Sequence, residues 1–143
     1  MKSTKANTIR EKFVSTFEKT LKEKLVPKKE ISNNVYEINS CKLFIYIAVI
    51  SGAKTNSVSW RVAENTISKI NPNYFIVFLE KSDTRGYIVA QNDVEYYLNN
   101  NIWVVTEKIK NKGTISVNKK RLSRNTFNET QKELFAKIIS VFK

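Results

Sequence analysis

The chain has 143 residues, of which 41% are hydrophobic and 11% aromatic, enough for one domain (residues 1–143) with a real core and too apolar for a disordered chain. Lys and Arg number 25 against 13 Asp and Glu, a formal net charge of +12. No apolar run approaches the roughly 18 residues of a membrane-spanning helix. Cys41 is the single cysteine, which excludes an intramolecular disulfide. We therefore expect a cytoplasmic protein with no membrane partner.

The positive charge is the strongest compositional feature of the chain. An excess of this size raises affinity for polyanions, because Lys and Arg neutralise phosphates and release their counterions. The alternative is that a Lys- and Asn-rich chain uses its lysines only as solubilising surface. The excess is spread along the chain rather than gathered in a tail, so it does not indicate a disordered basic arm. On charge alone, a nucleic acid is the favoured partner.

An amphipathic helix is expected over residues 8–25. Thr8 would cap it, with Glu11 three positions later completing a capping box, and Pro27 lies just beyond its end. The apolar stripe advances in steps of four residues: Ile9, Phe13, Phe17, Leu21 and Leu25.

The most apolar stretch covers residues 43–50 and reads Leu-Phe-Ile-Tyr-Ile-Ala-Val-Ile. Its length and β-branched content favour a strand buried on both faces, and residues 74–79 have the same character. Alternation over 35–39 and a short turn at 39–41 predict an antiparallel hairpin with 43–50. Seven side chains of the two runs are expected to be buried: Leu43, Ile45, Ile47, Val49, Phe75, Val77 and Leu79.

Shorter elements complete the predicted fold. They are strands at 58–63, 87–90, 102–105 and 114–117, a short helix or turn at 64–73, a short helix from Asn92 or Asp93 to Leu98, and a helix over 128–142 started by Asn125 or Asn128. We expect an α/β (α+β) single domain whose central mixed β-sheet is flanked by an N-terminal and a C-terminal helix. The sheet would contain 35–39, 43–50, 58–63, 74–79 and 87–90.

Residue types limit the chemistry that the chain can perform. It has no histidine and one cysteine, which removes His-dependent nucleophilic sites and structural zinc. The three glycines are too scattered to form a phosphate-binding loop. Mg²⁺ held by carboxylates is the metal chemistry that remains, with Glu18, Glu37 and Glu64 as candidate ligands. Each is more simply explained as a surface carboxylate.

Basic residues gather between two of the late predicted elements, where only Glu107 offsets them. This cluster consists of Lys108, Lys110, Lys112, Lys119, Lys120, Arg121 and Arg124. Its place in a connection, without acidic partners at helical spacing, favours phosphate contact over internal pairing. Lys54 and Arg61 form a second candidate patch beside the aromatic Trp60. The alternating position of Trp60 favours a core role for that side chain.

The order of elements resembles that of the restriction-endonuclease-like nuclease superfamily. The resemblance runs roughly over residues 8–105: a helix, a hairpin with a buried second strand, the strand of Ser59-Trp60, a helix, then Tyr-Phe-Ile-Val-Phe-Leu at 74–79 and Gly-Tyr-Ile-Val at 86–89. It implies a mixed sheet flanked by helices, and nuclease chemistry with Mg²⁺ when the metal ligands are present.

The metal ligands of that superfamily are an acidic residue on one strand and an Asp/Glu/Gln-x-Lys triplet on the next. Laid onto this chain, the triplet falls on Ala48-Val49-Ile50, which has neither the ligand nor the lysine. Glu37 stands near the first acidic position, and Glu18 resembles a helix glutamate that some members use. Lys42 or Lys54 would have to replace the missing lysine. The resemblance therefore implies a nuclease-like scaffold with a degraded catalytic motif.

Three functional hypotheses follow. The first is a basic, nuclease-like DNA-binding protein without catalysis or cofactor, such as a subunit of a restriction or mobile-element system. The second is a small Mg²⁺-dependent DNA endonuclease with relocated ligands. The third is a phage-encoded protein that binds and inhibits a host nuclease, which the net charge does not favour because DNA mimics are acidic. A protein partner or a homodimer remains compatible with all three.

Overall fold

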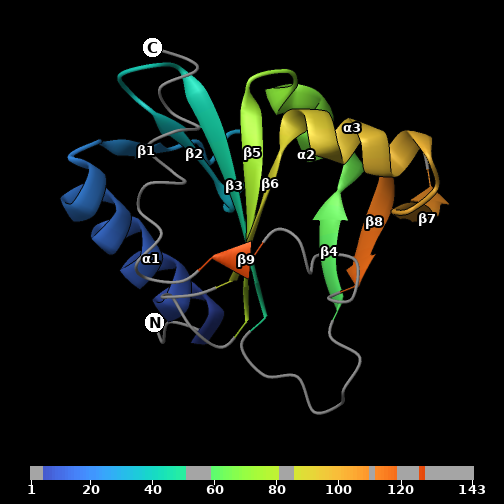
Figure 1. Cartoon of the computed structure of the whole chain (residues 1–143), viewed down its shortest axis with the longest axis horizontal. Helices are drawn as coiled ribbons and strands as arrows, with labels where there is room; N and C mark the ends of the chain where they lie inside the picture. The colour runs from blue at the N-terminus through green and yellow to red at the C-terminus, as the bar shows by residue number, and fades with distance from the viewer. Residues whose placement is uncertain (1–4, 51–58, 81–85, 110–111, 119–125, 128–143) are drawn as a thin grey trace.

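A mixed β-sheet forms the middle layer of the computed structural model (Figure 1), which describes residues 5–50, 59–80, 86–109, 112–118 and 126–127. Within these residues the main sheet has six strands in the order β1-β2-β3-β5-β6-β9. They are β1 (Leu25–Pro27), β2 (Val35–Ile38), β3 (Leu43–Ile50), β5 (Tyr74–Glu80), β6 (Gly86–Ala90) and β9 (Thr126–Phe127). β3 and β5 run parallel, and the other neighbours are antiparallel.

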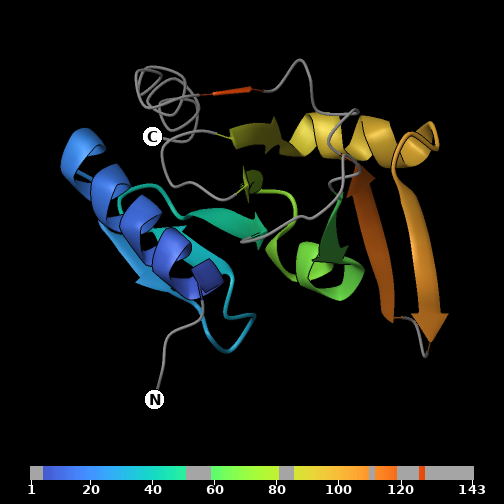
Figure 2. The same cartoon turned by 90° about the horizontal axis from the view of Figure 1, so that it is seen from below.

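Helix α1 (Lys5–Leu21) covers one face of the main sheet, and a second sheet with two helices covers the other (Figures 1 and 2). The second sheet has the order β4-β8-β7. Its elements and the two helices are β4 (Ser59–Ala63), β7 (Val104–Ile109), β8 (Lys112–Asn118), α2 (Glu64–Ile70) and α3 (Gln91–Asn99). The predicted α+β fold with a mixed central sheet is confirmed. The helix predicted over 128–142 lies outside the described residues.

Strand β3 contributes to two separate cores, one on each face of the sheet. Leu43, Ile45 and Ile47 pack with Phe13 and Phe17 of α1. The alternate side chains of β3 turn to the other face, where Tyr46 and Ala48 join the core under the second sheet. β5 divides its side chains in the same way, so β3 can be apolar at every position and β5 at every position before Glu80.

The predicted hairpin and burial pattern hold with one exception. β2 pairs with β3 from Val35↔Tyr46 to Ile38↔Leu43, and the turn between them is closed by Lys42 N–H donating to the Ile38 carbonyl at 3.0 Å. Of the seven side chains that were expected to be buried, six are buried. Val49 is only half-buried, because the end of β3 extends past β2 and borders a cavity.

The N-terminal helix is displaced from its predicted span of 8–25. It is already helical at Lys5, so Thr8 lies inside the helix and cannot be its cap. It ends at Leu21, and Lys22 takes the left-handed backbone conformation (φ 54°) that turns the chain. Leu25, the fifth member of the apolar stripe, is buried as the first residue of β1 instead. An apolar residue at every fourth position is typical of a helix, but the last residue of such a series can also be buried in the strand that follows the helix, as Leu25 is.

Strand β4 was expected in the central sheet and belongs to the second one. Its predicted alternation is correct, since Trp60 and Val62 are buried while Arg61 and Ala63 are exposed. Its partner is β8, because β5 already occupies the edge of β3 from Phe44↔Tyr74 to Ile50↔Glu80. An alternating pattern determines which face of a strand is buried, but it does not determine which strand pairs with it.

The described residues include no helix long and apolar enough to cross a membrane.

Candidate functional site

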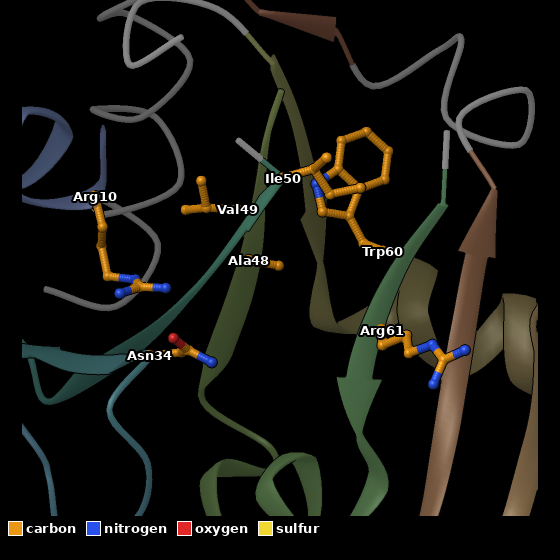
Figure 3. Close-up of a pocket in the computed structure, with 7 residues that line it drawn as sticks. All are labelled: Arg10, Asn34, Ala48, Val49, Ile50, Trp60 and Arg61. Atoms are coloured by element: carbon orange, nitrogen blue, oxygen red, sulfur yellow. The ribbon is translucent and has the colours of Figure 1, made fainter. Parts of the chain in front are cut away.

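A cavity of about 310 Å³ lies at the end of β3. Figure 3 shows Arg10 and Asn34 on one side of the strand and Trp60 and Arg61 on the other. Among the described residues, seven line it: Arg10, Asn34, Ala48, Val49, Ile50, Trp60 and Arg61. The cavity therefore lies where α1, the start of β2, the end of β3 and β4 approach one another.

The cavity exists because β3 is longer than its antiparallel partner. Strand pairing with β2 stops at Val35↔Tyr46, and one further bond joins Ile47 N–H to the Asn34 carbonyl at 2.8 Å. Beyond that point Ala48, Val49 and Ile50 have no neighbour in β2. The Asn34 backbone is held in its turn by donating its N–H to Ser32 Oγ at 3.1 Å.

Arg10 approaches the cavity from α1, and its guanidinium points toward β3 (Figure 3). Nη1 donates to Asn7 Oδ1 at 2.7 Å. Nε is buried and has no hydrogen-bond partner in the part of the chain that the structure describes. Burial raises the pKa of the nearby Tyr36 phenol, and the positive charge of Arg10 opposes that rise. Arg10 is thus a cation held against the sheet with donor capacity left over.

The β4 side of the cavity is structural. Trp60 is 1% exposed, and its Nε1–H donates to the Leu79 carbonyl at 3.1 Å. This confirms the core role expected for Trp60. Arg61 is exposed, and its guanidinium extends away from the end of β3 over the second sheet (Figure 3). Arg61 therefore borders the cavity without directing its charge to the Arg10 side.

The polar lining of the cavity suits an anion. The described lining residues include two arginines and an asparagine, with no carboxylate among them. The remaining wall is apolar. A guanidinium in a partly desolvated site attracts carboxylate or phosphate oxygens and repels a metal ion.

The predicted carboxylates are engaged elsewhere. Glu18 Oε2 accepts the Leu25 N–H at 2.9 Å and so closes the connection from α1 to β1. Glu37 forms an ion pair with Lys28 at 3.5 Å and lies opposite Phe44, near the start of β3 and away from the cavity. Among the described residues, no three His, Cys, Asp or Glu side chains are grouped so that they could hold a metal ion.

Two further candidates are also placed apart from the cavity. Lys42 is exposed in the β2–β3 turn with a left-handed backbone (φ 56°), so it does not stand near the expected triplet. Glu64 is the first residue of α2, after β4. Neither residue lines the cavity.

Two members of the predicted basic cluster lie in described strands. Lys108 and Lys112 belong to β7 and β8, neighbouring strands of the second sheet, and only their backbones are described. The remaining members and the second-patch lysine lie outside the described residues: Lys54, Lys110, Lys119, Lys120, Arg121 and Arg124. Their role in binding stays a prediction.

Arg10 and Asn34 were not predicted as site residues. The sequence does contain a signal for Arg10, which precedes the buried Phe13 and Phe17 by three and seven residues and so shares their helix face. A charged residue on a buried stripe indicates a special environment. No such signal exists for Asn34, because an Asn-Asn pair is the ordinary composition of a turn.

Comparisons with protein-family models, with curated proteins and with solved structures found no match to this chain.

Proposed function

We propose that the protein binds DNA without cleaving it. The observation that carries this proposal is the lining of the cavity at the end of β3. The metal-binding triplet of the nuclease superfamily would fall on Ala48-Val49-Ile50, and these residues instead form an apolar wall beside Arg10 and Asn34. A positive site in that place attracts a phosphate directly, where a carboxylate site would need a metal ion to do so.

The charge of the whole chain supports the same proposal. A net charge of +12 attracts DNA at long range, and each phosphate that a Lys or Arg neutralises adds a salt-dependent term to the affinity. The mixed sheet with its parallel β3–β5 pair is compatible with a nuclease-like scaffold. We expect the protein to act in the cytoplasm, where DNA and a protein partner or a second copy of the chain are accessible to it.

The first experiment measures binding. A fluorescently labelled DNA duplex is titrated with the protein at salt concentrations from about 50 to 200 mM, and anisotropy gives the affinity. We expect the logarithm of the affinity to fall linearly with the logarithm of salt concentration. Absence of binding even at the lowest salt would contradict the proposal and make the protein-binding hypothesis the leading one, with a pull-down as the next experiment.

The second experiment measures cleavage. Duplex and single-stranded DNA incubated with the protein and Mg²⁺ or Mn²⁺ should stay intact on a denaturing gel. Cleavage that is lost in Glu37→Gln or Glu18→Gln would instead establish the endonuclease with relocated ligands. Cleavage that survives both substitutions would also contradict the proposal, unless a mock preparation purified in the same way without the protein cleaves DNA equally.

A further inference from the structure

We propose that the cavity at the end of β3 is a metal-independent binding site for one phosphate ester group, with Arg10 as its charged contact. Arg10 Nε is a buried donor without a partner among the described residues. A buried donor left unsatisfied costs about 1–3 kcal/mol, so native structures rarely keep one without a reason. An oxygen in the cavity would satisfy this donor once a small shift of the Arg10 side chain uncovers the Nε–H.

A phosphate group fits the donors available. A guanidinium presents its N–H groups in a planar fork, and phosphate oxygens accept two of them in parallel. Nη1 is already engaged by Asn7 Oδ1 at 2.7 Å, which fixes the plane of the group. Nε and Nη2 then form the edge of the fork that can receive a phosphate.

The cavity is larger than a bare phosphate needs. Its volume of about 310 Å³ is at the lower end of the range for pockets that bind small organic ligands, which starts at about 300 Å³. Val49 and Ile50 offer an apolar wall to the group esterified to the phosphate. The Asn34 side chain lies on the same side of β3 as Arg10 and supplies a donor and an acceptor (Figure 3). A nucleotide matches this combination of charge, amide and apolar surface.

The inference rests on the proposed function only where DNA is the source of the phosphate ester. A free nucleotide carries the same group and would enter the same cavity. The two sources are separated by competition, because a nucleotide bound in a DNA-contacting cavity is displaced by an unlabelled DNA duplex.

The experiment uses thymidine 5′-monophosphate as the probe and calorimetry as the measurement, with EDTA present. Thymidine without its phosphate is the ligand control. We expect saturable binding of the nucleotide and none of thymidine. Arg10→Gln should weaken nucleotide binding about ten- to hundredfold, the loss expected for a hydrogen bond to a charged group. Lys12→Gln removes the same charge from an exposed position of α1 and should leave the affinity within about twofold.

A second measurement does not depend on a variant that folds. In an NMR titration of the wild-type protein, the Arg10 Nε–H signal and the amide signals of Ala48, Val49 and Ile50 should shift together as nucleotide is added. Shifts confined to other amides, or equal losses in Arg10→Gln and Lys12→Gln, would overturn the assignment of the cavity.

The outcomes also separate this inference from the proposed function. DNA binding that persists while the nucleotide fails to bind would overturn the phosphate-ester site and leave the DNA proposal intact. Nucleotide binding in a protein that ignores DNA would support the site and reject the DNA proposal. If both DNA and the nucleotide bind, displacement of the nucleotide by the duplex identifies DNA as a source of the phosphate. If the duplex does not displace the nucleotide, the cavity is a separate site for free nucleotide.

Discussion

Trp60 connects the two sheets at the scale of a single residue. Its indole donates to the Leu79 carbonyl of β5 at 3.1 Å, and its ring lies 5.3 Å from Phe78 and 5.7 Å from Tyr87. Phe78 in turn contacts Trp103 edge-on at 5.9 Å. This aromatic group joins β4 to the main sheet and so holds one wall of the cavity in place.

Trp60→Phe should lower the free energy of unfolding by about 2–4 kcal/mol, because it leaves the buried Leu79 carbonyl without its donor and opens a void. Urea denaturation measures the loss. Tyr96→Phe, at a side chain that is 57% exposed, is the control and should change stability by less than about 0.5 kcal/mol. An equally small effect at Trp60 would contradict its tethering role.

Gly86 is required by close approach of two strands. A Cβ at this position would lie 2.1 Å from the Phe78 carbonyl oxygen, on the neighbouring strand β5. Gly86→Ala should therefore force β5 and β6 apart at a cost of about 2–4 kcal/mol. The thermal midpoint should fall clearly, while Ser116→Ala, at an exposed position of β8, should leave it nearly unchanged. Similar midpoints for the two variants would refute the steric argument.

Tyr74 gives the protein a specific sensitivity to alkaline pH. Burial, reinforced by the Glu95 carboxylate, raises the pKa of its phenol. Below the usual tyrosine pKa of about 10, the folded and unfolded states are both protonated at this site. Above it the unfolded state loses the proton that the folded state keeps, so stability falls as pH rises. The difference between the urea midpoints at pH 9 and pH 11 should be smaller in Tyr74→Phe than in the wild type, and an unchanged difference would contradict this.

At the scale of elements, β3 and β5 are the centre of the fold. They pair over their full lengths and lie between the α1 core and the core under the second sheet. Their amides should exchange hydrogen only on global unfolding, more slowly than those of β1 at the sheet edge. Hydrogen exchange followed by NMR tests this. Rapid exchange across residues 43–50 would mean that β3 does not organise the molecule.

The sequence predicted these central strands because a long β-branched run has few alternatives to a buried strand. The sequence-based prediction was wrong for the end of the first helix and for the sheet that contains β4. Leu25 fits the four-residue spacing of the apolar helix positions, but it is buried in β1. The alternation predicted for β4 is correct, but the strand pairs with β8 in the second sheet and not with the central sheet. Local pattern determines periodicity and the buried face, whereas strand partners depend on contacts distant in sequence.

The candidate site was less accessible to prediction than the fold. The sequence located the strand end at Ala48-Val49-Ile50, and the cavity lies there. The residues that give the cavity its charge come from elements distant in the chain. Arg10 precedes the buried Phe13 and Phe17 by three and seven residues, which places it on their side of the helix. Only the packing of α1 against the sheet brings it to β3.

At the scale of the whole molecule, the proposed DNA binding requires that the positive charge contacts DNA phosphates. If the predicted basic cluster makes those contacts, removing its charges must weaken DNA binding more than removing the charges of other surface lysines. Two quadruple alanine variants separate these cases. One replaces Lys119, Lys120, Arg121 and Arg124, and the other replaces the exposed Lys12, Lys19, Lys24 and Lys29.

The deciding measurement is the slope of log affinity against log salt for a DNA duplex. Each phosphate contact contributes about −0.9 to this slope, so losing all four cluster residues should reduce its magnitude by about four. The control variant removes equal charge and should keep the wild-type slope. The claim would be contradicted if the cluster variant bound DNA with the wild-type slope, or if both variants lost affinity and slope equally.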